Sequence, residues 1–222
     1  MQGNPRQRRR VVRWSAEKTS FDGPAGQLEG LLESMRDSAP VASAVICHPH
    51  PVHGGTMHNK VVHTLARAFI GQRFSVLRFN FRGTGQSEGK YDQGRGELLD
   101  ALAAIRCMRE RAPHLPLWLA GFSFGAAIAI RASLETEPEG LISVAPAGSP
   151  VADNRDAQPA CPWLIIHGDQ DEVVDIDETV EWVNKLEPGP ELTVFPDTKH
   201  FFHGKLLLLR QAVETFVREN RI

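Results

Sequence analysis

The sequence predicts an α/β fold, in which helices cover both faces of a mainly parallel sheet of eight strands. Two short strands around a turn come first, and strand-like and helix-like segments then alternate as far as the C-terminus. The expected strands are residues 16–21, 27–33, 42–47, 74–79, 117–120, 141–145, 163–167 and 191–195. The expected helices are residues 56–70, 97–111, 124–134, 177–186 and 205–219.

Local patterns support these elements in order along the chain. Asp22-Gly23-Pro24 predicts the turn between the first two strands. Residues 42–47 form a short apolar run that ends at His48-Pro49, which indicates a buried strand. Residues 56–70 carry apolar side chains at helical spacing, and Thr56 is the candidate N-cap. The later helix at residues 97–111 likewise gathers its leucine, isoleucine and methionine side chains on one face.

Length and charge limit the organisation of the chain. A chain of 222 residues is large enough for one well-buried core and small for two, so we expect a single domain at residues 16–222. Residues 1–15 contain five arginines and are expected to form a flexible basic tail, with binding to nucleic acid or a membrane surface as the alternative for that segment. The formal net charge of −2 gives no other reason to expect nucleic acid as a partner.

Hydropathy and cysteine content favour a cytoplasmic protein. No apolar run approaches the roughly 20 residues of a membrane helix, and the N-terminus lacks an apolar stretch of signal-peptide type. The three cysteines, Cys47, Cys107 and Cys161, are odd in number and widely spaced, which fits reduced thiols better than disulfides. We expect no membrane partner, and the oligomeric state stays open.

The most specific motif is Gly121-Phe122-Ser123-Phe124-Gly125, which joins an expected strand directly to an expected helix. Such a tight turn raises the serine hydroxyl above the sheet, and its glycines let the strand and helix backbones approach closely. The helix N-terminus behind the serine favours developing negative charge. We therefore predict Ser123 as a nucleophile.

A serine hydroxyl needs a base to take its proton, and histidine is the usual one. His200 follows the last expected strand, at the carboxyl edge of the sheet where ligand sites of such folds lie. His203 would open the following helix, and His167 ends a strand, where we expect it to be held in the turn. His200 is the predicted base.

The base in turn needs a carboxylate to orient it. Three acids follow the strand at residues 163–167, and Asp171 is our choice among them. Asp169 is expected to accept hydrogen bonds from backbone amides beside Gly168, and Glu172 to point outward. The chain order Ser123, Asp171, His200 is the order described for nucleophile turns of this kind.

The loop after the third strand could supply an oxyanion hole. Proline has no N–H, so Pro49 and Pro51 leave the amide of His50 as the expected donor beside the amide of Phe124. A metal site is the rival interpretation, because His48, His50 and His53 are closely spaced, but no acidic or cysteine ligands cluster with them.

Two neighbouring groups are interpreted as structural. Cys47 ends a buried strand and is expected to be an inert thiol. Residues 80–87 follow another strand with glycines at turn spacing, and we expect Arg82 to hold neighbouring loops together.

These motifs resemble the α/β-hydrolase superfamily from about residue 16 to the C-terminus, and more closely a group of small bacterial serine hydrolases distantly similar to dienelactone hydrolases. The resemblance is carried by residues 48–62, 78–83, 121–125 and 200–202. It implies a catalytic triad of Ser123, Asp171 and His200. The chain departs from dienelactone hydrolases proper, which have cysteine in place of Ser123, and from many relatives that have aspartate in place of Asn80.

We expect an α/β-hydrolase fold without a cap domain, because residues 147–162 are too few for one. The triad would cleave an ester or thioester of a small acyl substrate with no metal or organic cofactor. The alternatives are a peptidase or acyltransferase with the same triad, or a catalytically idle binding protein. The expected pocket residues are Met57, Phe122, Phe124, Phe201 and Phe202.

Overall fold

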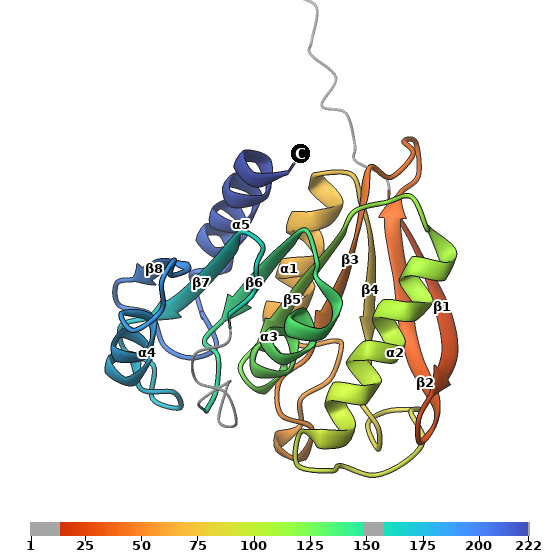
Figure 1. Ribbon diagram of the computed structural model, residues 1–222, viewed down its shortest axis with the longest axis horizontal. Helices are drawn as coiled ribbons and strands as arrows, with labels where there is room; N and C mark the ends of the chain where they lie inside the picture. The colour runs from red at the N-terminus through yellow and green to blue at the C-terminus, as the bar shows by residue number, and fades with distance from the viewer. Residues whose placement is uncertain (1–13, 149–157, 222) are drawn as a thin grey trace, which may run out of the picture.

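The structure is a computed structural model that describes residues 14–148 and 158–221. Its eight described strands form one sheet in the order β1-β2-β4-β3-β5-β6-β7-β8 (Figure 1). The strands are β1 (Trp14–Gly23), β2 (Gly26–Met35), β3 (Ala42–Cys47), β4 (Phe74–Phe79), β5 (Leu117–Phe122), β6 (Gly140–Val144), β7 (Trp163–Gly168) and β8 (Glu191–Phe195). The first two pairings, β1 with β2 and β2 with β4, are antiparallel, and the remaining pairings are parallel. The predicted fold class is confirmed.

Helices cover both faces of this sheet (Figure 1). They are α1 (Lys60–Gly71), α2 (Arg95–Arg111), α3 (Phe124–Thr136), α4 (Ile176–Val183) and α5 (Leu206–Asn220), with a short 3₁₀ turn, η1 (Pro51–His53). The cluster of buried apolar residues on one face includes side chains of α1 and α5, and the cluster on the other includes side chains of α2, α3 and α4. The sheet therefore lies between two hydrophobic layers.

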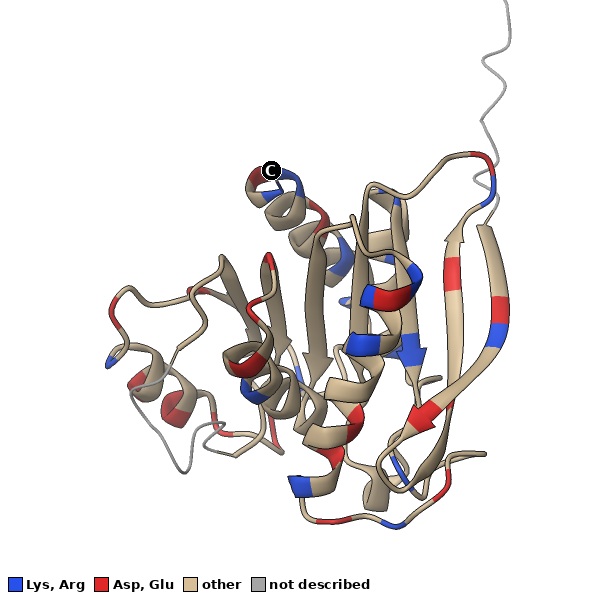
Figure 2. Cartoon of the chain, turned by 45° about the vertical axis from the view of Figure 1, so that its right-hand side comes forward, with Lys and Arg blue, Asp and Glu red and all other residues tan. Residues whose placement is uncertain are grey.

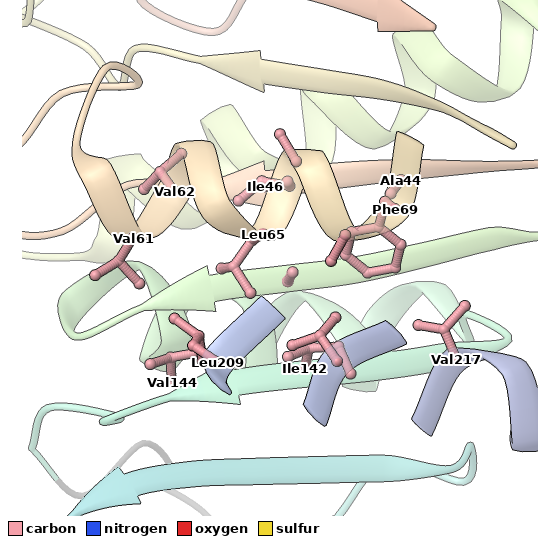
Figure 3. Packing of buried hydrophobic residues seen from close by; sticks show 14 of the residues in the cluster. Ala44, Ile46, Val61, Val62, Leu65, Phe69, Ile142, Val144, Leu209 and Val217 are labelled. Atoms are coloured by element: carbon pink, nitrogen blue, oxygen red, sulfur yellow. The ribbon is translucent and has the colours of Figure 1, made fainter. Parts of the chain in front are cut away.

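The layer formed by α1 and α5 shows why these segments are helical. The apolar side chains of each recur every three or four residues, so they line one face that turns toward the sheet. Figure 3 shows Val61 and Leu65 of α1 and Leu209 of α5 gathered over Ile46 and Ile142 of the strands. Burying an aliphatic side chain of this size contributes about 1.5–3 kcal/mol, so this layer is a main source of stability.

The first long helix begins later than the sequence pattern predicts. It starts at Lys60, and its N-cap is Asn59, whose side-chain oxygen accepts from the Val61 amide at 2.8 Å. The expected cap Thr56 is wrong because tertiary contacts hold the preceding turn out of the helix. The Met57 amide donates to Asn80 Oδ1 at 2.9 Å, and the Met57 carbonyl accepts from Arg78 at 2.6 Å.

The strand β1 begins at Trp14, inside the range expected to be a tail. The remainder of that expected tail, residues 1–13, lies outside the described residues. In the view of Figure 2, positions of Lys or Arg and positions of Asp or Glu are interspersed along the helices and the β1–β2 hairpin. No helix among the described residues is both long and apolar enough to cross a membrane.

Candidate active site

Three polar side chains meet at the carboxyl edge of the sheet. Ser123 directly follows β5, Asp171 follows β7, and His200 follows β8. Because these strands run parallel to one another, their carboxyl ends lie at the same edge. The fold therefore collects residues that are 77 and 29 positions apart in the chain.

Ser123 occupies a strained turn between β5 and α3. Its backbone has φ = 56° and ψ = −121°, a conformation that non-glycine residues rarely adopt. The Ser123 amide donates to the Val144 carbonyl at 2.8 Å, which anchors the turn on β6. A Cβ atom at Gly121 would collide with the backbone of Gly125, so the glycine spacing of the motif is a steric requirement.

His200 links the serine to the acid. Its Nε2 lies 3.1 Å from Ser123 Oγ, and its Nδ1 lies 2.7 Å from Asp171 Oδ2. A carboxylate accepts only, so Nδ1 carries the proton and Nε2 is left to accept from the serine hydroxyl. The imidazole is 2% exposed, and the rings of Phe122 and Phe201 lie 4.9 and 5.1 Å from it between centroids.

Asp171 is held by donors on both of its oxygens. Oδ1 accepts from the amides of Val173 and Val174, each at 2.9 Å, and Oδ2 faces His200 and also His167 Nε2 at 3.3 Å. Burial by itself would raise the pKa of this carboxyl, but the hydrogen bonds from His167, His200 and the two amides outweigh it and hold the pKa below its ordinary value. The acid therefore stays ionised at neutral pH.

The two other acids of this loop have different partners. Asp169 Oδ1 accepts from the Thr198 amide at 3.1 Å, as expected for a residue that caps backbone. Glu172 is exposed, as expected, but its Oε2 also lies 3.4 Å from the His200 amide. Of the three acids, Asp171 is the one whose carboxylate contacts the imidazole of His200.

The two amides proposed as oxyanion donors lie on segments in contact. Phe124 opens α3, and His50 precedes η1, with their rings 4.9 Å apart. A Cβ atom at Gly125 would collide with the carbonyls of Cys47 and His48, so the start of α3 packs directly against the end of β3. The oxyanion hole itself stays a prediction.

His48 connects the loop that contains His50 to the segment that follows β4. Its Nδ1 lies 2.6 Å from the Pro49 carbonyl, and its Nε2 accepts from the Phe81 amide at 3.0 Å. Burial lowers the pKa of His48 to about 4, against a smaller opposite effect of the Pro49 hydrogen bond. Both ring nitrogens are therefore engaged, and no group of three or more potential metal-ligating side chains occurs among the described residues.

Most of the expected pocket residues are in the core. Phe122 and Phe202 are 0% exposed and Met57 is buried, because Phe122 and Phe202 join the layer beneath the site and the turn at Met57 is fixed by Asn80 and Arg78. These three do not line an open pocket. Phe201, in contrast, is 43% exposed beside the His200 ring and remains available to a substrate, as does half-buried Phe124.

Tyr91 and His167 are site residues that the sequence reasoning missed. The Tyr91 hydroxyl lies 3.1 Å from His50 Nε2, and its ring also contacts that of Phe124. The sequence predicts only that His167 is held in a turn, whereas its ring lies 3.3 Å from Asp171 Oδ2. The position of His167 four residues before Asp171 was a usable signal, whereas nothing local pointed to Tyr91.

The residues interpreted as structural behave accordingly. The buried ion pair of Arg82 with Asp100 joins the β4–α2 connection to α2, with guanidinium–carboxylate distances of 2.9 and 2.7 Å. Asn80 Nδ2 donates to Glu29 at 2.7 Å while Oδ1 accepts from Met57. An aspartate at position 80 would place a second negative charge beside Glu29. Burial raises the pKa of the Cys47 thiol strongly, so this thiol is a poor nucleophile.

Comparison with known proteins defines the class to which this fold and site belong. Residues 44–160 match the model of a hydrolase family described as serine aminopeptidase, S33, and the chain belongs to this family within the α/β-hydrolase superfamily. A solved structure from Xanthomonas campestris, described as an α/β serine hydrolase without lid, is 43% identical and superposes with a TM-score of 0.87, covering 92% of this chain and 94% of that one.

Two further relatives are similar over most of the chain. An α/β serine hydrolase homologue from Coxiella burnetii is 42% identical with a TM-score of 0.85, covering 90% of this chain and 96% of that one. An uncharacterised protein of Rickettsia prowazekii is 32% identical over 208 residues, which cover 89% of this chain and 87% of that protein.

Proposed function

We propose that the protein is a serine hydrolase that cleaves an ester or thioester of a small acyl substrate through a covalent acyl-enzyme on Ser123. The observation that carries this proposal is the pair of contacts made by His200, at 3.1 Å to Ser123 Oγ and 2.7 Å to Asp171 Oδ2. Nucleophile, base and orienting acid are within hydrogen-bond reach before any substrate is present.

The reaction follows from these positions. His200 Nε2 takes the hydroxyl proton as Ser123 Oγ bonds to the acyl carbon, and the amides of Phe124 and His50 donate to the resulting oxyanion. The protonated His200 then gives its proton to the leaving alcohol or thiol as the acyl–oxygen or acyl–sulfur bond breaks. A water molecule then attacks the acyl carbon while His200 takes its proton, and His200 returns that proton to Ser123 Oγ as the acyl–Oγ bond breaks and the acid leaves.

Electrostatics favour each proton transfer. The ionised Asp171 stabilises the imidazolium that forms at His200, and the low pKa of Asp171 prevents it from taking the proton itself. The N-terminus of α3, directly behind Ser123, places partial positive charge near the oxyanion. Typical oxyanion donors of this kind contribute about 3–4 kcal/mol each.

A peptidase is the second candidate, because the matching family is described as serine aminopeptidase. The same groups can attack an amide and protonate an amine leaving group. A free α-amino group on a substrate would need a negative partner, and Glu172 is an exposed carboxylate beside His200. The two candidates therefore differ in the leaving group and in the need for this carboxylate.

The test combines covalent labelling with a substrate panel. A fluorophosphonate should label the wild type and Cys47→Ser, and should leave Ser123→Ala unlabelled. The panel should contain p-nitrophenyl esters of increasing acyl length, acyl-CoA thioesters and aminoacyl p-nitroanilides, with a free alcohol added to detect acyl transfer. We expect turnover of short esters or thioesters that depends on Ser123.

Three results would contradict the proposal. Preferred cleavage of the aminoacyl anilides, reduced by Glu172→Gln, would favour the peptidase. Turnover that survives Ser123→Ala and is lost in Cys47→Ser would identify a cysteine nucleophile. A purified protein that takes no label and turns over none of the panel would be an idle binding protein.

A further inference from the structure

We propose that His167 is a positioning residue for the catalytic acid, a second imidazole that donates a hydrogen bond to the same Asp171 oxygen that His200 uses. This inference rests on the proposed function, in which Asp171 orients His200. It extends the triad by one group that never touches the substrate.

The described part of the chain offers hydrogen-bond partners to only one of the two ring nitrogens of His167, Nε2. His167 is the next-to-last residue of β7 and is 0% exposed. Its Nε2 lies 3.1 Å from the Val174 carbonyl oxygen and 3.3 Å from Asp171 Oδ2. Among the described residues, the buried Nδ1 of this ring has no hydrogen-bond partner.

These neighbours select the protonation state of His167. Both atoms near Nε2 are acceptors, so Nε2 must carry a proton to bond to either of them. A proton on Nδ1 would be buried without an acceptor, which disfavours both the doubly protonated ring and the neutral ring protonated on Nδ1. In that neutral ring, the lone pair of Nε2 would also face two oxygen atoms. The neutral ring protonated on Nε2 is the state that fits, and it makes His167 a fixed donor.

With the N–H of His167, both carboxylate oxygens of Asp171 accept two hydrogen bonds each. Oδ1 takes the Val173 and Val174 amides, and Oδ2 takes Nδ1–H of His200 and Nε2–H of His167. The Val174 carbonyl accepts from the same Nε2–H, so His167 binds both the carboxylate and the loop that donates to it. The carboxylate cannot rotate away from His200 without losing bonds on both oxygens.

A histidine that served packing alone would affect stability and leave the protonation of His200 unchanged. Loss of a donor to Oδ2 would instead leave more negative charge facing His200, which stabilises the imidazolium. The acidic limb of the kcat/KM profile would then move to higher pH. The charged groups Glu172, 3.4 Å from the His200 amide, and Lys199, its neighbour in the chain, are unchanged in the test.

The experiment compares His167→Gln with His167→Leu on the best ester from the panel. The terminal amide of glutamine can reach the Nε2 position and donate, whereas leucine fills the space without a donor. His167→Gln should keep kcat and the acidic limb close to wild type. His167→Leu should lower kcat by about 10- to 100-fold with little change in KM, the range seen when the hydrogen-bond partners that orient metal-binding histidines are removed, and should move the acidic limb to higher pH.

The control is Ile165→Val, which removes a methyl group from a fully buried residue two positions earlier in β7. It should lower stability and leave the pH profile unchanged. If His167→Leu behaves like this control, or if His167→Gln loses as much kcat as His167→Leu, the positioning role is wrong.

A second measurement does not depend on turnover. In protein labelled with ¹⁵N-histidine, NMR assigns the tautomer of each ring, and the His167 signals are those missing from His167→Gln. We expect Nε2–H and an unprotonated Nδ1 at neutral pH. A protonated Nδ1 would overturn the inference even if the protein hydrolysed every ester, and failure of the proposed function would appear separately as no turnover by wild type.

Discussion

At the scale of single residues, the proposed mechanism depends on three groups that act together. Ser123 is held in a strained backbone conformation and contacts His200, and His200 depends on Asp171 for its tautomer. In such a unit, removal of one member removes most of the contribution of the others. The mutational effects should therefore be strongly non-additive.

We expect Ser123→Ala and His200→Ala each to lower kcat by about 10⁴- to 10⁶-fold, and the double variant to be no more than a few-fold worse. Asp171→Asn should cost about 10⁴-fold, because it disturbs the base without removing it. Steady-state kinetics on a p-nitrophenyl ester measure all four variants. Additive losses in the double variant would show that Ser123 and His200 do not act together.

His48 predicts a pH dependence of stability. Its pKa falls from 6.5 to about 4 on folding, so the unfolded chain binds a proton between these values and the folded protein does not. The stabilising contribution of neutral His48 is fully present above pH 6.5 and is lost as the pH falls toward 4. The loss amounts to roughly 3 kcal/mol, at about 1.4 kcal/mol for each pH unit.

Urea unfolding at several pH values between 7.5 and 4.5 measures this effect. His48→Gln should be less stable than wild type at pH 7.5 and should lose less stability on acidification, because its side chain does not titrate. Equal losses in the two proteins would mean that His48 does not titrate in this range.

At the scale of elements, the position of Ser123 depends on how closely α3 approaches β3. The contact is possible because Gly125 has no side chain, since a Cβ atom there would collide with the carbonyls of Cys47 and His48. The same approach brings the Phe124 amide near the loop of His50. Packing of one helix against one strand therefore shapes the proposed oxyanion hole.

Gly125→Ala should be destabilising by about 1–3 kcal/mol through overpacking and should slow fluorophosphonate labelling. The expected loss of stability is opposite to the usual effect of a glycine-to-alanine substitution within a helix, where alanine is preferred by about 1 kcal/mol. Gly71→Ala in α1 is the matched control, because a Cβ atom there meets only the ends of the Glu214 and Arg210 side chains. An unchanged labelling rate in Gly125→Ala would refute the close-approach argument.

At the scale of the whole molecule, the candidate site lies at the carboxyl edge of one sheet. The short β6–β7 connection predicts no cap, although its residues 149–157 lie outside the described residues. The similar Xanthomonas campestris hydrolase is described as having no lid. A site without a lid needs no rearrangement at a lipid–water interface before substrate enters.

We therefore expect short-chain, water-soluble esters to follow a simple saturation curve that continues unchanged through the solubility limit of the substrate. Initial rates measured across that limit test the expectation. A sharp rise in rate once an emulsion forms would indicate a lid and would contradict the open site.

The sequence by itself determined the class of fold and placed the three residues of the proposed triad directly after strands. Alternating apolar runs located the strands at residues 42–47, 74–79 and 191–195 without error. The places of Ser123, Asp171 and His200 after strands followed from the same local patterns, since parallel strands share a carboxyl edge. These features depend on the pattern of residues that are close together in the chain, so a single sequence is enough to predict them.

The tertiary structure decided what depends on contacts between distant segments. It placed β4 between β2 and β3, buried Phe122 and Phe202 in the core, and delayed α1 through bonds from Asn80 and Arg78. It also brought Tyr91 to His50, a contact between residues 41 positions apart in the chain. Local periodicity shows which segments carry apolar side chains. Only packing decides which of these side chains are buried and which distant polar groups come into contact.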